Sequence, residues 1–111
     1  MSRDEVMFLK DILLSCEKIL NYTEDLTLEK LIEDEKTYDA VVRNLEIIGE
    51  AAKHISEQTR KKMPEIPWRN VAGLRDFITH VYFGIDNDIL WDVVRNKIPQ
   101  LQDEINNLLK E

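Results

Sequence analysis

Apolar residues recur at steps of three and four positions along most of this chain, and glycine or proline seldom interrupts them. The 111 residues contain three glycines and three prolines, and 43% of them are hydrophobic. Apolar residues at this spacing form one face of an amphipathic helix, and an apolar fraction of this size can fill one core. The sequence therefore predicts a single all-α domain over residues 1–111, an up-and-down bundle of four or five helices.

Polar breaks, prolines and capping residues divide this pattern into separate helices. The first is expected over residues 3–22, and the second from the N-cap Thr27 to near Lys62, before Pro64. A third is expected over residues 68–82, with Gly84 as its end. Asp86 then caps a last helical region, which Pro99 kinks or divides.

The predicted second helix carries an apolar seam that is typical of helix–helix contacts. Its members are Tyr38, Val41, Leu45, Ile48, Ala52 and Ile55. Gly49 lies within this helix, where glycine costs about 1 kcal/mol relative to alanine. We therefore expect another helix or a ligand to approach the backbone closely at Gly49.

Charge is unevenly distributed along the chain. The net charge of −7 argues against an ordinary nucleic-acid binder. One stretch nevertheless concentrates the bases Arg60, Lys61, Lys62, Arg69 and Arg75 against a single acid. Arg60, Lys61, Lys62 and Arg69 could contact RNA phosphates, or the first three could complement the dipole at a helix C-terminus.

The cysteine count and the hydropathy indicate a compartment. A single cysteine, Cys16, cannot form an internal disulfide, which favours a reducing, cytoplasmic environment. Its place in the apolar stripe of the first helix predicts a buried filler rather than a reactive thiol. No run approaches the roughly 20 apolar residues of a membrane span, so no membrane association is expected.

Metal and cofactor chemistry finds no support in the sequence. The two histidines, His54 and His80, are far apart in the chain, and no Cys/His cluster is present. We interpret His54 as a surface histidine, and Trp68 and Trp91 as core or interface anchors. No metal and no cofactor are predicted.

Residues 73–82 combine three groups that could cleave RNA without a metal ion. Arg75 offers a planar fork for phosphate oxygens, His80 titrates near neutral pH, and Tyr82 supplies a hydroxyl and a flat ring. One group would take the proton of a ribose 2′-hydroxyl while the arginine stabilises the phosphate. The alternative is an ordinary helix end, with an arginine paired to a nearby carboxylate and two half-buried rings.

Four segments, in order, resemble the HepT-like toxins of the HEPN superfamily. They are Arg43–Ala52, Ile66–Arg69, Ala72–Asp76, and His80–Asp86 with Leu90-Trp91 after it. The Arg-x4-His-x-Tyr motif runs from Arg75 to Tyr82. The resemblance implies a homodimeric, HEPN-like helical fold and a metal-independent endoribonuclease acting on RNA, with Arg75 and His80 as the catalytic pair. It also implies that a minimal nucleotidyltransferase (MNT) antitoxin silences the toxin by adding AMP to Tyr82.

The spacing of the catalytic pair is difficult for one straight helix. Residues five apart lie about 140° around the helix axis, so Arg75 and His80 would point in different directions. Arginine's reach, a distortion near Thr79, or a site shared by two protomers would resolve this. A dimer would also account for the long seam and for Gly49.

Thr79 and three acidic residues are expected to support the site. Glu46 and Glu50 share one helix face and could position Arg75 or orient His80, or they could be a solvated pair. Asp76 follows Arg75 and is placed at the edge of the cleft. Two other functions remain open from the sequence: a non-catalytic nucleotide- or partner-binding module that works with a nucleotidyltransferase, and a purely structural dimerising bundle.

Overall fold

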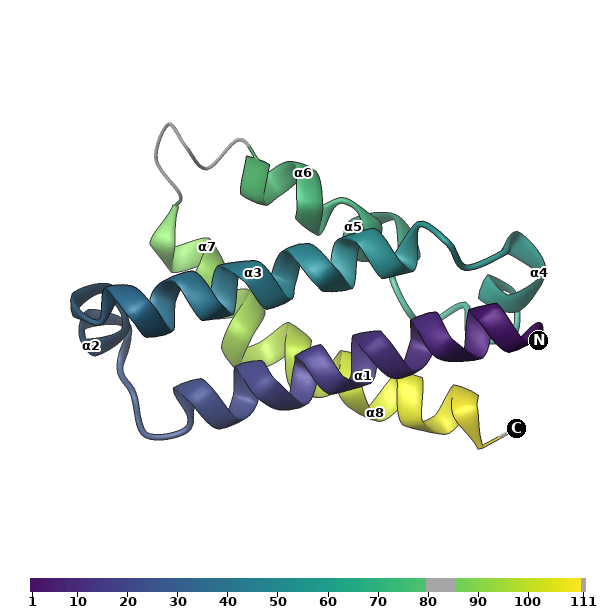
Figure 1. Cartoon of the computed structure of the whole chain (residues 1–111), viewed down its shortest axis with the longest axis horizontal. Coiled ribbons are helices and arrows are strands. Elements are labelled where there is room, and N and C mark those ends of the chain that lie inside the picture. The colour runs from purple at the N-terminus through teal and green to yellow at the C-terminus, as the bar shows by residue number, and fades with distance from the viewer. Residues whose placement is uncertain (80–85, 111) are drawn as a thin grey trace.

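The computed structural model describes residues 1–79 and 86–110, and each regular element within these ranges is helical (Figure 1). The all-α prediction is confirmed. The first helix, α1, spans Arg3–Thr23, close to the predicted 3–22. Ser2 caps it by accepting a 3.1 Å hydrogen bond from the Glu5 backbone N–H. Within the described residues, no helix is long and apolar enough to cross a membrane.

The second predicted helix is three helices in the structure, so its prediction as one element was wrong. They are α2 (Leu28–Glu33), α3 (Glu35–Ala52) and α4 (Glu57–Arg60). Thr27 caps α2 as predicted, by accepting from the Lys30 N–H at 3.2 Å. Asp34 breaks the continuity because it leaves the helical conformation and caps α3, accepting from the Thr37 N–H at 3.1 Å.

The core lies between the longest helices. α3 runs back along α1, and α8 (Ile98–Leu109) packs on the other side of α1 (Figure 1). The seam of α3 is used inside this core, where Val41, Leu45, Ile48 and Ala52 are fully buried. The seam therefore gives no reason to expect a dimer, because α1 and the neighbouring helices of the same chain already cover it.

The predicted third helix is also divided. α5 spans Trp68–Ala72, Gly73 forms a turn, and α6 spans Leu74–Thr79. Both short helices pack on α3 (Figure 1). Trp68 is a buried core anchor, as predicted, and its indole N–H donates to the Met63 carbonyl at 3.1 Å. The predicted end of this helix near Gly84 lies outside the described residues.

The last helical region is divided just before Pro99. Asp86 caps α7 (Asn87–Asp92) as predicted, by accepting from the N–H groups of Asp88 and Ile89 at 3.0 and 3.3 Å. A π-helical turn, Val93–Lys97, then leads into α8, with Pro99 in the first turn. This position suits proline, which lacks the N–H that a helix interior requires.

Candidate active site

Arg75 lies at the start of α6, directly against α3, and Gly49 makes this contact possible. A Cβ atom placed on Gly49 would lie 2.6 Å from the Arg75 backbone nitrogen and 3.2 Å from its Cβ. The close approach predicted at Gly49 is therefore confirmed. The approaching element belongs to the same chain, so Gly49 does not require a dimer.

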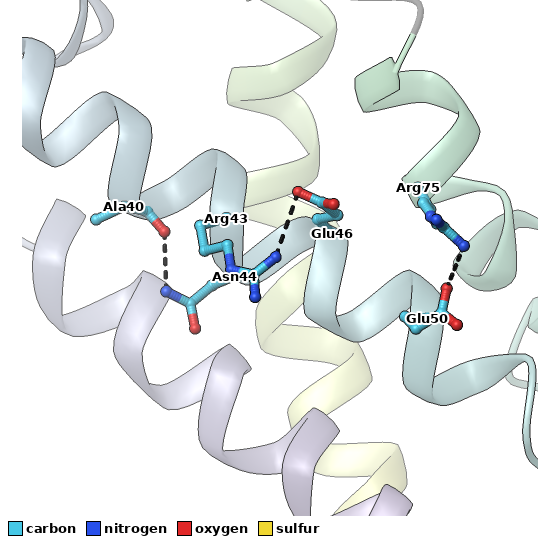
Figure 2. Close-up of polar contacts among 6 residues, drawn as sticks. All are labelled: Ala40, Arg43, Asn44, Glu46, Glu50 and Arg75. Carbon is cyan, nitrogen blue, oxygen red and sulfur yellow. Dashed lines mark hydrogen bonds and ion pairs between the residues drawn. The ribbon is translucent and has the colours of Figure 1, made fainter.

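A short ion pair fixes the Arg75 side chain on α3. Its Nη1 donates to Glu50 Oε2 at 2.6 Å, and both side chains are about half exposed (Figure 2). Charge-assisted bonds of this kind orient a guanidinium as well as attract it. Glu50 thus contacts Arg75, which is one of the three arrangements that the sequence left open.

Glu46 is placed differently, although it lies on the same helix. Its carboxylate is 3.7 Å from Arg43 Nη1, one turn earlier on α3 (Figure 2). At that distance the two groups attract each other without a hydrogen bond. Glu46 therefore lies beside the site and pairs with Arg43.

These side chains line an open groove of about 330 Å³ between α1, α3 and α6, here called the Arg75 groove. Its lining residues are Phe8, Asp11, Arg43, Glu46, Ile47, Glu50, Ala51 and Arg75. Two arginines and three carboxylates thus face one apolar floor. Phe8 and Asp11 could not be predicted as lining residues, because α1 reaches this place only through tertiary packing. Arg43 could have been found, since it lies seven residues before Glu50 and shares its helix face.

His54 was interpreted as a surface histidine, and the structure gives it partners. Its ring stacks on Phe8 with centroids 4.4 Å apart and planes 8° apart. Its Nε2 lies 3.8 Å from Glu50 Oε1, while the other oxygen of that carboxylate binds Arg75. The imidazole remains about half exposed. His54 therefore borders the site through Glu50.

Part of the predicted motif lies outside the described residues. His80 and Tyr82 are both in this part, so the relative placement of the catalytic pair stays a prediction. Thr79 is the last residue of α6. Asp76, next to Arg75, is exposed at the start of α6, and its place in the cleft also stays a prediction.

The other four bases of the basic stretch do not line the Arg75 groove. Arg60 donates to the Ala52 carbonyl at 2.8 Å and to the Ile55 carbonyl at 3.1 Å, and its guanidinium lies 5.9 Å from the centre of the Trp68 ring. These contacts favour the structural interpretation, in which Arg60 caps the end of α3. Lys61 and Lys62 directly follow α4 and are exposed.

Arg69 is exposed on α5 and lines another groove, of about 350 Å³, with Phe77 and Leu74. This groove shares no lining residue with the Arg75 groove. RNA contacts by Arg60, Lys61, Lys62 and Arg69 remain predictions, and the structure brings none of them to Arg75.

Cys16 is fully buried, as predicted for a filler. Burial raises the pKa of its thiol to about 12, so the thiolate is not populated near neutral pH. Over residues 1–79 and 86–110, no three side chains of His, Cys, Asp or Glu come together as metal ligands.

Comparison with known proteins points to one family. The model of the ribonuclease HepT-like family matches residues 12–108. A Thermococcus cleftensis protein named probable ribonuclease HepT is 42% identical over 99% of this chain and 100% of its own length. Two Methanocaldococcus jannaschii proteins, both named putative RNases, are 43% identical (98% of this chain, 90% of theirs) and 40% identical (93% and 94%). No solved structure gives a significant match. The chain belongs to the HepT-like ribonuclease family.

Proposed function

We propose that this protein is a metal-independent endoribonuclease, the toxin of a toxin–antitoxin pair, with Arg75 and His80 as its catalytic residues. Membership of a ribonuclease family supports the reaction and the RNA substrate. The observation that carries the proposal is the placement of Arg75. Gly49 allows the Arg75 backbone to pack directly on α3, and Glu50 binds the Arg75 guanidinium. The Arg75 side chain lines an open groove.

The proposed reaction needs only proton transfer and charge stabilisation. A ribose 2′-oxygen loses its proton, attacks the adjacent phosphorus, and displaces the 5′-oxygen of the next nucleotide. The products are a 2′,3′-cyclic phosphate and a new 5′-hydroxyl. His80 moves the protons, and Arg75 stabilises the charge on the phosphate oxygens.

Glu50 is proposed as a positioning residue for Arg75. A half-exposed arginine samples many rotamers, and the 2.6 Å contact restricts them. Glu50→Gln keeps the shape of the side chain and removes its charge. We expect about tenfold slower cleavage with little change in folding, because exposed ion pairs add little stability.

The direct test is a cleavage assay with and without EDTA, together with expression of the chain alone while growth and RNA integrity are measured. We expect cleavage to survive EDTA, the product to carry a 2′,3′-cyclic phosphate, and His80→Ala to lose about 10²–10⁴-fold activity. Loss of cleavage with EDTA would contradict metal independence. Specific binding without cleavage would favour the alternative, a non-catalytic nucleotide- or partner-binding module.

A homodimer is the proposed assembly, and α1 offers a surface for it. Met7 and Leu14 are 59% and 50% exposed and lie seven residues apart, on the same face as Asp11 of the Arg75 groove. A second copy that covers this stripe would adjoin the groove. We expect light scattering to give a dimer at micromolar concentration, with an interface of at least about 1,000 Å². A monomer that still cleaves RNA would contradict this assembly.

The proposed control is AMP transfer to Tyr82 by an MNT-type nucleotidyltransferase antitoxin in the cytoplasm. The tyrosine oxygen would attack the α-phosphorus of ATP and release pyrophosphate. The added phosphate would then pair with Arg75 in place of the RNA phosphate, and the adenosine would block the groove. Tyr82→Phe should keep much of its cleavage activity and escape the antitoxin. Mass spectrometry of the co-expressed pair should find AMP on the Tyr82 peptide, and an unmodified peptide in a fully silenced toxin would contradict this control.

A further inference from the structure

Two arginines, rather than one, line the groove proposed for RNA. Arg43 and Glu50 are seven residues apart on α3, so they share a face at about 10.5 Å along the helix axis. Arg75 is bound to Glu50. The guanidinium groups of Arg43 and Arg75 are therefore placed at successive positions along one groove (Figure 2).

The two arginines are held very differently. Arg75 Nη1 lies 2.6 Å from Glu50 Oε2. Arg43 Nη1 lies 3.7 Å from Oε2 of Glu46, three residues later on α3. The Arg43 side chain is 68% exposed. An exposed pair at this spacing contributes only a few tenths of a kcal/mol. A phosphate could therefore displace Glu46 from Arg43 at little cost.

We propose that Arg43 binds a backbone phosphate of the RNA strand whose scissile phosphate lies at Arg75. The strand would follow the face of α3 from Glu50 toward Arg43. This inference rests on the proposed function. It adds the direction in which the bound RNA strand runs away from Arg75. It also assigns the flanking phosphate contact to α3, rather than to the Arg60–Arg69 stretch.

Asp11, on α1, provides an independent check on the same path. It lines the groove opposite α3 and is exposed. A carboxylate beside a bound phosphate repels it. If RNA follows this groove, removal of the charge in Asp11→Asn tightens RNA binding, whereas an RNA bound elsewhere would not respond.

The test measures binding of a fluorescent single-stranded 2′-O-methyl RNA, which cannot be cleaved, as a function of salt. Arg43→Gln should weaken binding about 3–10-fold and reduce the salt slope by about 0.7, the value for one lost contact to a single strand. Arg43→Lys should retain most of the affinity. The matched control is Lys30→Gln on α2, an exposed base that lines no groove described above.

Folding and assembly are checked by thermal melting and light scattering, which should be the same for all variants. If the wild-type protein binds and cleaves RNA but Arg43→Gln behaves like Lys30→Gln, the Arg43 contact is wrong and the proposed function stands. If the folded wild-type protein neither binds nor cleaves RNA, the proposed function fails and the Arg43 contact fails with it.

Discussion

Arg60 and Arg75 come from the same basic stretch of sequence, and both bind the C-terminal end of α3. Arg60 bonds to the main-chain carbonyls of Ala52 and Ile55 and is half-buried beside Trp68. Arg75 bonds to the Glu50 side chain and faces an open groove. The first arrangement adds hydrogen bonds to carbonyls at and just beyond the end of α3, whereas the second presents a guanidinium where a ligand can reach it. Positive charge in a sequence therefore does not separate a capping arginine from one that lines an open groove.

The largest expected effect comes from Arg75. Arg75→Ala should lower the cleavage rate about 10²–10³-fold, because it removes the group that we propose stabilises the transition-state charge. Arg75→Lys should also be strongly impaired, since an ammonium cannot replace the planar fork. Melting temperatures of both variants should stay near that of the wild type, because the pair with Glu50 is exposed. Full activity in Arg75→Ala would contradict the proposal that Arg75, unlike Arg60, acts in cleavage.

Gly49→Ala tests the packing of Arg75 on α3 and leaves the chemistry of the Arg75 side chain unchanged. The new Cβ would lie 2.6 Å from a backbone atom, so α6 must move away from α3. We expect a loss of about 1–3 kcal/mol in the free energy of unfolding and a clear loss of activity. Gly73→Ala is the graded control, because its nearest contact is longer, 3.2 Å to the Arg69 carbonyl. Equal effects of the two variants would contradict this account of Gly49.

The fold and the site were predictable from the sequence where they depend on local pattern. Asp86, Thr27 and Cys16 act as predicted because capping and apolar periodicity are local properties. Gly49 was found because an interior glycine is costly and so calls for a close contact. The partner of that contact was not found, since only tertiary packing brings α6 to α3.

The seam of α3 shows the limit of the same reasoning. Periodicity identifies an apolar face, but it does not say whether a neighbouring helix or a second chain covers it. Here α1 covers the face, and the dimer prediction has to stand on the exposed stripe of Met7 and Leu14 instead. Asp34 shows a second limit, because one residue that caps a following helix divides a continuous apolar pattern.

A smaller effect, mainly on stability, is expected from Arg60. Arg60→Ala removes two hydrogen bonds and leaves the Ala52 and Ile55 carbonyls without this partner. We expect about 1–3 kcal/mol lower stability in denaturant titrations. Cleavage measured well below the melting temperature should fall far less than in Arg75→Ala. A rate loss as large as that of Arg75→Ala, with stability unchanged, would instead make Arg60 part of the RNA site.

The smallest effect concerns the pH dependence of stability. It involves the contact between α1 and α4, the helix that ends at Arg60. Glu5 accepts from the Ser56 N–H at 2.6 Å and from the Thr59 hydroxyl at 2.9 Å, which ties α1 to the start of α4. These hydrogen bonds, those from Ser56 first, lower the pKa of Glu5 from 4.5 to about 2. A lowered folded-state pKa means that the stabilisation is complete above about pH 4.5 and is lost as the pH falls toward 2.

Glu5→Gln should therefore be less stable than the wild type at pH 7, and the difference should shrink in acid. Unfolding titrations at pH 7, 4 and 3 measure this, and a difference that stays constant over this range would contradict the assignment of the tether to the ionised carboxylate.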